Sequence, residues 1–182
     1  MVRRRGMVVG MTGLAAMGSG VAGAIGGKLA APDRPVVCVC GDGDFQMTGL
    51  EVLTAVANQA PVVWVIMDNG RLGMIRDIQT LSYHGRTEAS LLNNPDFVTL
   101  ARAMDADGYR ISAADELTGV VQQALKSGRP TVIDVPTDPS ELPPMKPRML
   151  ALSRTVGLPS THRSISWQST KALARMILRH EK

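Results

Sequence analysis

Short β-branched runs alternate with longer stretches of helical periodicity from residue 36 onward. The runs VVCVC (36–40) and VVWVIM (62–67) are continuous and apolar, as is typical of strands buried on both faces. GYRIS (108–112) and TVIDVP (131–136) are predicted as further strands. This rhythm predicts an α/β fold, with a parallel sheet and helices on both faces in three layers.

Three helices are predicted between these strands, over residues 48–59, 95–104 and 114–128. The second begins with a proline and the third ends at Gly128, which are common residues at helix ends. The first carries apolar residues at three- and four-residue spacing, which predicts one buried face: Leu50, Leu53, Val56 and Ala57.

Length and charge divide the chain unequally. With 182 residues and 45% hydrophobic content, one core is expected, and we assign residues 1–147 to a single domain. Residues 148–182 are predicted as a basic tail with an amphipathic helix. From Lys146 onward there are eight Lys/Arg and one Glu, but Trp167 is the only aromatic residue there, so no nucleic-acid partner is expected.

The two cysteines indicate a reduced protein. Cys38 and Cys40 are two apart on a predicted strand, so both point to one face and cannot bridge each other. A cytoplasmic location is therefore expected. No run approaches the roughly 20 apolar residues that cross a bilayer, so no membrane association is predicted. The three histidines lie in polar or terminal stretches, where surface roles are expected: His84, His162 and His180.

A dinucleotide-binding fingerprint is matched between Gly18 and Gly23, which read G-S-G-V-A-G, with Asp42 19 residues further on. That fingerprint requires a strand running into its first glycine. The preceding segment, Leu14 to Met17, has no β-branched residue. The glycines are therefore interpreted as sites of close helix packing.

The segment GDGDFQM (41–47) and the turn Asp68-Asn69-Gly70 follow two predicted strands. Because carboxyl ends of neighbouring parallel strands meet at one sheet edge, Asp42 and Asn69 are expected close together. Their oxygens suit Mg²⁺, which often links protein carboxylates to phosphates. The simpler alternative is that Asp42 caps a helix and Asn69-Gly70 forms a tight turn.

The ordered motifs resemble the thiamine-diphosphate enzymes, and within them the acetolactate synthase-like group. The landmarks are GLAAMGSGVAGAIGGKLAAPDRPVV, GDGDFQMTGLEVLTAV, MDNGRLGMIRDIQ and NNPDFVTLARAM. The resemblance covers roughly residues 7–147 and implies the C-terminal, diphosphate-binding domain, which holds thiamine diphosphate and Mg²⁺.

By this resemblance, Mg²⁺ would be bound by Asp42, the Asn69 side chain and the Arg71 carbonyl, with two diphosphate oxygens and a water. The resemblance also implies a set of cofactor-binding residues: Ala15, Met17, Gly41, Gly43, Asp44, Met47 and Met74. Ala15 would accept a hydrogen bond from the aminopyrimidine through its carbonyl, and Met17 would support the bent cofactor. Gly43 and Asp44 would present backbone N–H groups to the diphosphate.

Four positions depart from the family pattern. Asp68 stands where an asparagine is usual, Asp44 where the residue is commonly small, and Ala15 where glycine is common. Ile78 replaces the tryptophan that shapes the second-substrate pocket of acetolactate synthases. The departure at Ile78 weakens the assignment to acetolactate synthesis itself.

The resemblance implies half of an active site. In the family a glutamate from a separate pyrimidine-binding domain activates the cofactor, so no catalytic residue is expected in this chain. The predicted function is the cofactor-binding half of a 2-oxo-acid carboligase, in an oligomer that includes a pyrimidine-domain partner. Three alternatives are a subunit of a two-subunit decarboxylase such as sulfopyruvate decarboxylase, a ferredoxin-linked oxidoreductase subunit, and a non-catalytic truncated fragment. The oxidoreductase ranks low because the chain has no cysteine cluster.

Overall fold

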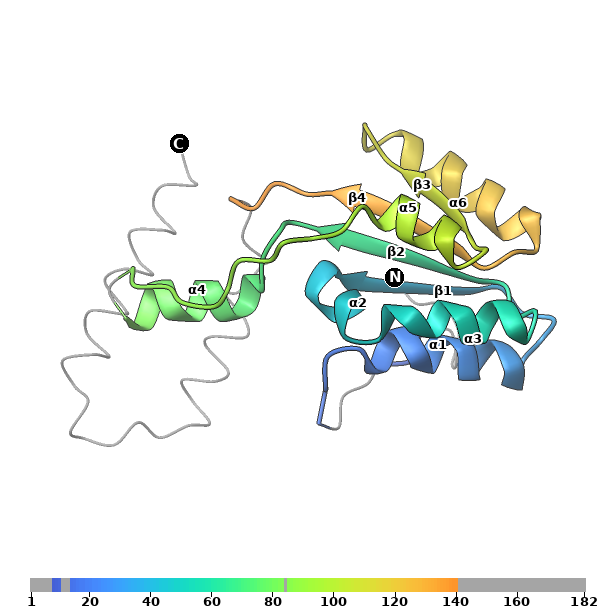
Figure 1. The fold of residues 1–182 in the computed structure, drawn as a ribbon, viewed down its shortest axis with the longest axis horizontal. Coiled ribbons are helices and arrows are strands. Elements are labelled where there is room, and N and C mark those ends of the chain that lie inside the picture. Colours follow the sequence, from blue (N-terminus) through green and yellow to red (C-terminus); the bar gives the residue numbers. More distant parts are fainter. Residues whose placement is uncertain (1–7, 11–13, 84, 141–182) are drawn as a thin grey trace. The chain divides into compact units, whose positions relative to one another are not determined.

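The computed structural model describes residues 8–10, 14–83 and 85–140, which form two compact units (Figure 1). The first unit comprises the described residues up to Gly70 together with Leu92–Thr137. The second comprises Arg71–Leu91 and the described residues after Thr137. The predicted basic tail with its amphipathic helix lies outside the described residues, as do all three histidines.

The first unit is built on a four-stranded parallel sheet. Its strands are β1 (Val36–Gly41), β2 (Val62–Asp68), β3 (Asp107–Arg110) and β4 (Thr131–Pro136), arranged in the order β1-β2-β4-β3. All three pairings are parallel, which confirms the predicted sheet. Since Gly41 pairs with Met67, the chain leaves β1 and β2 at the same edge.

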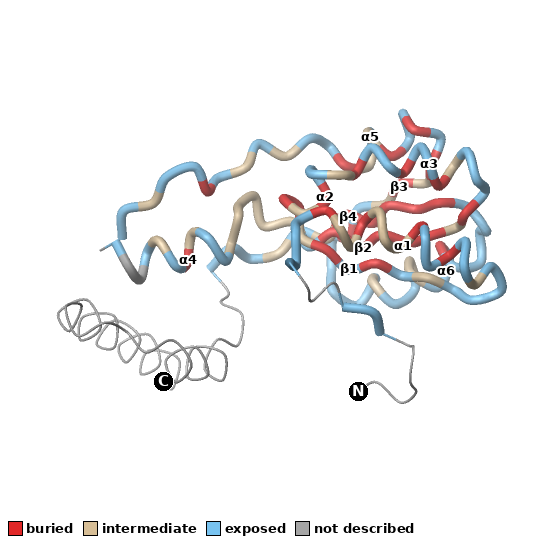
Figure 2. Tube along the Cα trace, turned by 90° about the horizontal axis from the view of Figure 1, so that it is seen from below, coloured by how far each residue is buried: buried red, intermediate tan, exposed pale blue. Residues whose placement is uncertain are grey.

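One sheet face is covered by several helices, which are α1 (Ser19–Ala30), α2 (Asp42–Thr48), α3 (Val52–Ala57) and α5 (Phe97–Ala103). The core on this face includes Trp64 and Phe45, each at most 1% exposed. The opposite face is covered by α6 (Glu116–Ser127), which packs on Val63, Val65 and Ile133. Helices on both faces confirm the three-layer α/β class, and Figure 2 shows β2 buried along most of its length.

The first predicted helix, 48–59, is wrong in its bounds and its buried face. The helical segment starts at Asp42 and is interrupted by the 3₁₀ turn Gly49–Glu51. Leu50 and Leu53 are 67% and 51% exposed, whereas Val52 and Ala55 are buried. The buried positions Phe45, Gly49, Val52 and Ala55 are spaced by four, three and three residues, so one helical face continues through the turn. The predicted face was displaced from it by one residue.

The helix predicted at 95–104 begins two residues later than expected, at Phe97. Asp96 is its N-cap, because the Asp96 carboxylate accepts hydrogen bonds from the backbone N–H groups of Val98 and Thr99 at 3.0 and 3.1 Å. The stop predicted at Gly128 is confirmed, since this glycine has a φ of 69° after α6.

Both cysteines lie buried in β1 and neither forms a disulfide, as their spacing predicts. Val37 and Val39 of the same strand point to the other face and are 42% and 68% exposed. The prediction that this strand is buried on both faces is therefore wrong, because β1 lies at the edge of the sheet. Within the part of the chain that the structure describes, no helix is long and apolar enough to span a bilayer.

The second unit contains α4 (Gly73–Ser82) and the segment that follows it. The backbone N–H of Leu72 donates to the Ser90 carbonyl at 2.8 Å, and Gln79 Nε2 donates to the Glu88 carbonyl at 2.9 Å. These bonds fold the returning segment against the helix.

Candidate functional site

Asp42 is a buried carboxylate of the first unit that accepts three hydrogen bonds. It is 2% exposed, directly after β1, and its Oδ1 accepts a hydrogen bond from the Gly43 N–H at 2.8 Å. Its Oδ2 accepts from the Gly70 N–H and from Asn94 Nδ2, both at 2.8 Å. The bond to Gly70 brings Asp42 against the turn that follows β2, as the parallel strands predict.

Asn69 belongs to that turn, and its side-chain oxygen has no hydrogen-bond donor among the described residues. The Oδ1 atom is buried and accepts no hydrogen bond. An unpaired buried carbonyl costs free energy, on the order of 1–3 kcal/mol, unless a bound group satisfies it. The structure thus leaves an oxygen ligand available beside the Asp42–Gly70 contact.

The glycines of the GDG segment have different surroundings. A Cβ on Gly41 would meet no atom within 4 Å, so open space lies beside the end of β1. The N–H of Gly43 is used by Asp42 Oδ1. The predicted donation from Gly43 to a diphosphate therefore remains a prediction from the resemblance.

Asp44 faces the glycine-rich segment that precedes α1. Its Oδ1 accepts a hydrogen bond from the Gly18 N–H, and Thr48 Oγ1 donates to the Gly18 carbonyl at 2.8 Å. Gly18 has a φ of 86°, and a Cβ there would lie 2.8 Å from Thr48 Cγ2. The described residues directly before Gly18, 14–17, form no strand, so they do not have the geometry that the dinucleotide fingerprint requires.

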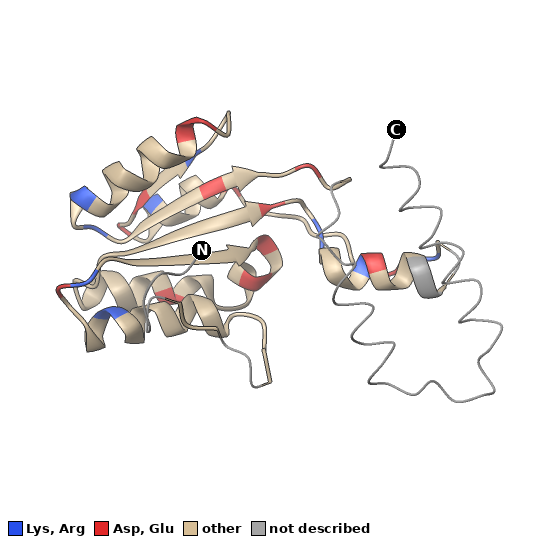
Figure 3. Ribbon diagram, turned by 180° about the vertical axis from the view of Figure 1, so that it is seen from behind, with Lys and Arg blue, Asp and Glu red and all other residues tan. Residues whose placement is uncertain are grey.

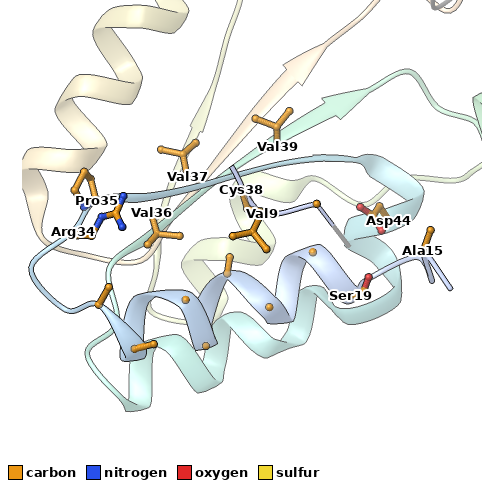
Figure 4. A pocket seen from close by; sticks show the side chains of 18 of the residues that line it. Val9, Ala15, Ser19, Arg34, Pro35, Val36, Val37, Cys38, Val39 and Asp44 are labelled. Carbon is orange, nitrogen blue, oxygen red and sulfur yellow. The ribbon is translucent and has the colours of Figure 1, made fainter. Parts of the chain in front are cut away.

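An open cavity of about 900 Å³ lies between α1, β1 and the segment before α1 (Figure 4). Ala15, Met17 and Asp44 line it, together with Val37 and Val39. Asp42 and Asn69 are not among its lining residues, so the cavity is distinct from the candidate metal ligands. Ala15 has a φ of 51°, which explains why glycine suits this position.

The predicted methionines are accessible. Met17 is 40% exposed, and Met47 on α2 is 63% exposed. Met74 lies on α4 in the second unit and is 57% exposed. Ile78 lies on the same helix and is 44% exposed. Exposed methionines do not behave as ordinary core residues, which leaves them available to contact a ligand.

Arg71, the third predicted metal ligand, also belongs to the second unit. Its guanidinium lies 4.0 Å from Asp77 and donates to the Pro139 carbonyl. Its backbone pairs with Leu91 in an isolated antiparallel bridge. The role of the Arg71 carbonyl remains a prediction from the resemblance.

The donor set of the first unit fits Mg²⁺ bound together with a diphosphate. Asp42 and Asn69 offer hard oxygen atoms, which this ion prefers. Among the described residues no group of three or more His, Cys, Asp or Glu side chains could hold a metal. A metal held here would need further oxygen ligands from water or from phosphates, as is usual for Mg²⁺.

Two polar groups near this edge were not singled out by the sequence. Asn94 contacts Asp42 and Asp68, while Asp134 of β4 is 1% exposed and pairs with Arg110 at 3.0 Å. Burial raises the pKa of the Asp134 carboxyl, whereas nearby Arg110 lowers it. Figure 3 shows acidic residues at the carboxyl ends of the strands. The position of Asp134 within the apolar run TVIDVP could have identified it from the sequence, because a buried charge needs a partner of opposite charge.

Comparison with known families matches residues 1–135 to "Thiamine pyrophosphate enzyme, C-terminal TPP binding domain". The match includes β1, β2, the GDG segment and Asn94.

Curated relatives are acetolactate synthase large subunits. The chain is 41% identical to that of Corynebacterium glutamicum over 67% of its length, and 39% identical to that of Parasynechococcus marenigrum over 90%. It is 38% identical over 71% to the isozyme 2 large subunit of Escherichia coli. These alignments cover 20%, 27% and 24% of the relatives, so the chain spans about a quarter of their length.

Proposed function

Since the chain belongs to the thiamine pyrophosphate enzymes as a C-terminal TPP binding domain of the acetolactate synthase-like group, we propose that it is the cofactor-binding half of a 2-oxo-acid carboligase. In this proposal it binds thiamine diphosphate together with Mg²⁺. Such a domain supplies binding and orientation, while the cofactor supplies the chemistry.

One contact carries the proposal, namely the hydrogen bond from the Gly70 N–H to Asp42 Oδ2 at 2.8 Å. It ties the carboxylate after β1 to the turn that holds the unpaired oxygen of Asn69. A carboxylate and a carboxamide oxygen at one sheet edge are suitable Mg²⁺ ligands. The open space beside Gly41 supports the approach of a diphosphate.

Each residue has a binding role in this proposal. Asp42 and Asn69 hold the metal, the Ala15 carbonyl accepts from the aminopyrimidine, and Met17 supports the bent cofactor. When bound, thiamine diphosphate supplies the electron sink that 2-oxo-acid decarboxylation and ligation require. The roles of Met47 and Met74 toward the 2-oxo acid rest on the family resemblance alone.

The activating glutamate would come from a pyrimidine-binding domain or subunit, in an oligomer. This is consistent with the relatives, of which the chain covers about a quarter. A cytoplasmic location is proposed as well, supported by two unbridged cysteines in β1. We therefore expect cofactor binding by this chain and turnover only with its partner.

Calorimetry tests the proposal by titrating thiamine diphosphate into the full chain with and without Mg²⁺. We expect heat only when Mg²⁺ is present, and loss of most of that heat in Asp42→Ala and Asn69→Ala. Matched controls are Asp33→Ala and Asn93→Ala, which remove the same groups from exposed positions. Absence of binding by the unmodified chain, even with a pyrimidine-domain partner, would contradict the proposal.

A decarboxylase is the second candidate, favoured by Ile78 where acetolactate synthases carry tryptophan. Ile78 is 44% exposed on α4 and fills less space than an indole. Product analysis with the partner domain and pyruvate distinguishes the two. A carboligase converts two pyruvate molecules to a ligated hydroxy-oxo acid and carbon dioxide, whereas a decarboxylase converts each pyruvate to an aldehyde and carbon dioxide.

A further inference from the structure

The Asn94 carboxamide joins three other polar side chains of the first unit. Its Nδ2 donates to Asp42 Oδ2 at 2.8 Å and to Asp68 Oδ1 at 2.5 Å. Its Oδ1 accepts a hydrogen bond from Gln46 Nε2 on α2. One amide group thus links the exits of β1 and β2 with α2.

Hydrogen-bond accounting at Asp42 leaves one acceptor position open. A carboxylate has about four lone-pair sites, two on each oxygen. Oδ2 already accepts from the Gly70 N–H and from Asn94, which uses both of its sites. Oδ1 accepts only from the Gly43 N–H, so one of its sites remains.

The same amide also separates two negative charges. Asp42 and Asp68 share two donors, the Asn94 Nδ2 and the Gly70 N–H, the latter lying 3.1 Å from Asp68 Oδ1. Like charges this close repel each other, and donors placed between them offset the repulsion. Without Asn94, Asp42 Oδ2 would keep one donor and the carboxylate would be freer to rotate.

We propose that Asn94 is a positioning residue for the metal site, which rests on the proposed binding of Mg²⁺ by Asp42. It fixes the Asp42 carboxylate so that Oδ1 is the oxygen that remains for the metal. It also occupies Asp68 Oδ1, so the aspartate that replaces the usual asparagine is held by hydrogen bonds within the protein. Asn94 itself contacts neither metal nor cofactor.

The test uses the full chain and measures the Mn²⁺ concentration that gives half-maximal thiamine diphosphate binding by calorimetry. For Asn94→Ala we expect this concentration to rise by about tenfold or more, the usual effect of losing a group that orients a metal ligand. Saturating Mn²⁺ should restore cofactor binding, which a general loss of folded structure would not allow. Asn93→Ala, an exposed neighbour, should match the unmodified chain.

Asp42→Ala separates this proposal from the proposed function, because it should abolish metal-dependent binding at every Mn²⁺ concentration. If the unmodified chain binds no cofactor with Mn²⁺, the proposed function fails. If it binds and Asn94→Ala has the same metal dependence, only the positioning role is overturned.

Gln46→Ala decides the matter if Asn94→Ala does not fold. Gln46 is exposed and bonds Asn94 Oδ1, so its loss releases the amide without removing the donors to the carboxylates. We expect a rise of about two- to fivefold in the half-maximal Mn²⁺ concentration, in line with the loss of one hydrogen bond. An unchanged concentration in this variant would overturn the proposal.

Discussion

Asp44 accepts a hydrogen bond from the backbone N–H of Gly18, which lies 26 residues earlier in the chain. The bond fastens α2 to the segment that contains Ala15 and Met17, both predicted to contact the cofactor. Thr48 reinforces it through the Gly18 carbonyl at 2.8 Å. The aspartate after the GDG segment therefore has a structural role in this chain, which is to accept the hydrogen bond from the Gly18 N–H.

Removing that carboxylate should destabilise the fold. Asp44→Ala leaves the Gly18 N–H without its charged acceptor, and such bonds contribute roughly 1.5–3 kcal/mol. We expect a decrease of about 2 kcal/mol in the free energy of unfolding, measured by urea denaturation. The exposed Asp33→Ala should change it by less than about 0.5 kcal/mol. Equal stability of the two variants would show that the bond contributes nothing.

Gly18 should not accept a side chain. In Gly18→Ala the new Cβ would lie 2.8 Å from Thr48 Cγ2 and 3.0 Å from Met47 Cβ, at a φ of 86°. We expect a loss of more than about 2 kcal/mol of stability from strain and overpacking. Gly26→Ala provides the opposite case, because no atom lies within 4 Å and the residue is inside α1. That variant should gain about 0.5–1 kcal/mol in thermal or urea unfolding.

Ala15 has a backbone conformation that glycine adopts more easily, with a φ of 51°. Ala15→Gly should stabilise the chain by about 1 kcal/mol, because the strain of the left-handed conformation is removed. The backbone carbonyl is kept, so cofactor binding should persist. Ala16→Gly, at an ordinary φ, should instead be neutral or destabilising, since it only adds freedom to the unfolded chain. Destabilisation by Ala15→Gly would show that the left-handed backbone conformation of Ala15 does not strain the folded chain.

Asp134 should impose a pH dependence on stability. Burial raises its folded-state pKa above the ordinary 3.8, so the folded state binds this proton more tightly than the unfolded state. Its contribution is thus fully present below the ordinary pKa and is lost as pH rises through the folded pKa. Asp134→Asn has no ionisable group at this position, so the loss of stability with rising pH should disappear. The Arg110 side chain is 56% exposed, so water still solvates its charge when the aspartate is absent.

We therefore expect Asp134→Asn to gain stability relative to the unmodified chain as pH increases above 3.8. Urea denaturation at a series of pH values, from acid to neutral, measures the difference between the two proteins. A difference that is constant with pH would mean that the pairing with Arg110 cancels the effect of burial, and a difference that shrinks as pH rises would mean that the pairing outweighs it.

Much of the first unit could be predicted from the sequence. Continuous β-branched runs identified β1 and β2. For β2 the reason is that a strand buried on both faces needs apolar residues at every position, whereas β1 is an edge strand with one exposed face. The strands and the GDG exit then placed Asp42 next to the turn of Asn69, since carboxyl ends of parallel strands share an edge. The contact from Gly70 to Asp42 agrees with that reasoning.

The errors came from phase rather than from composition. Leu50 and Leu53 were predicted as buried because their spacing fits one continuous helix. The buried face lies one residue away, at Phe45, Gly49, Val52 and Ala55, and a Cβ on Gly49 would lie 2.5 Å from the Phe45 ring. Because glycine has no apolar side chain to mark a buried position, the spacing of the leucines selected the neighbouring face.

By itself, the sequence determined the parallel sheet, the family of the chain and the proximity of Asp42 to the turn of Asn69, because these follow from local periodicity and short motifs. Only the tertiary structure decided what surrounds those ligands. Asn94 reaches Asp42 from 52 residues away, and Asp44 reaches Gly18 from 26. Such bonds depend on how distant segments pack together, and the residues next to a polar side chain in the sequence do not indicate which distant group it will bond.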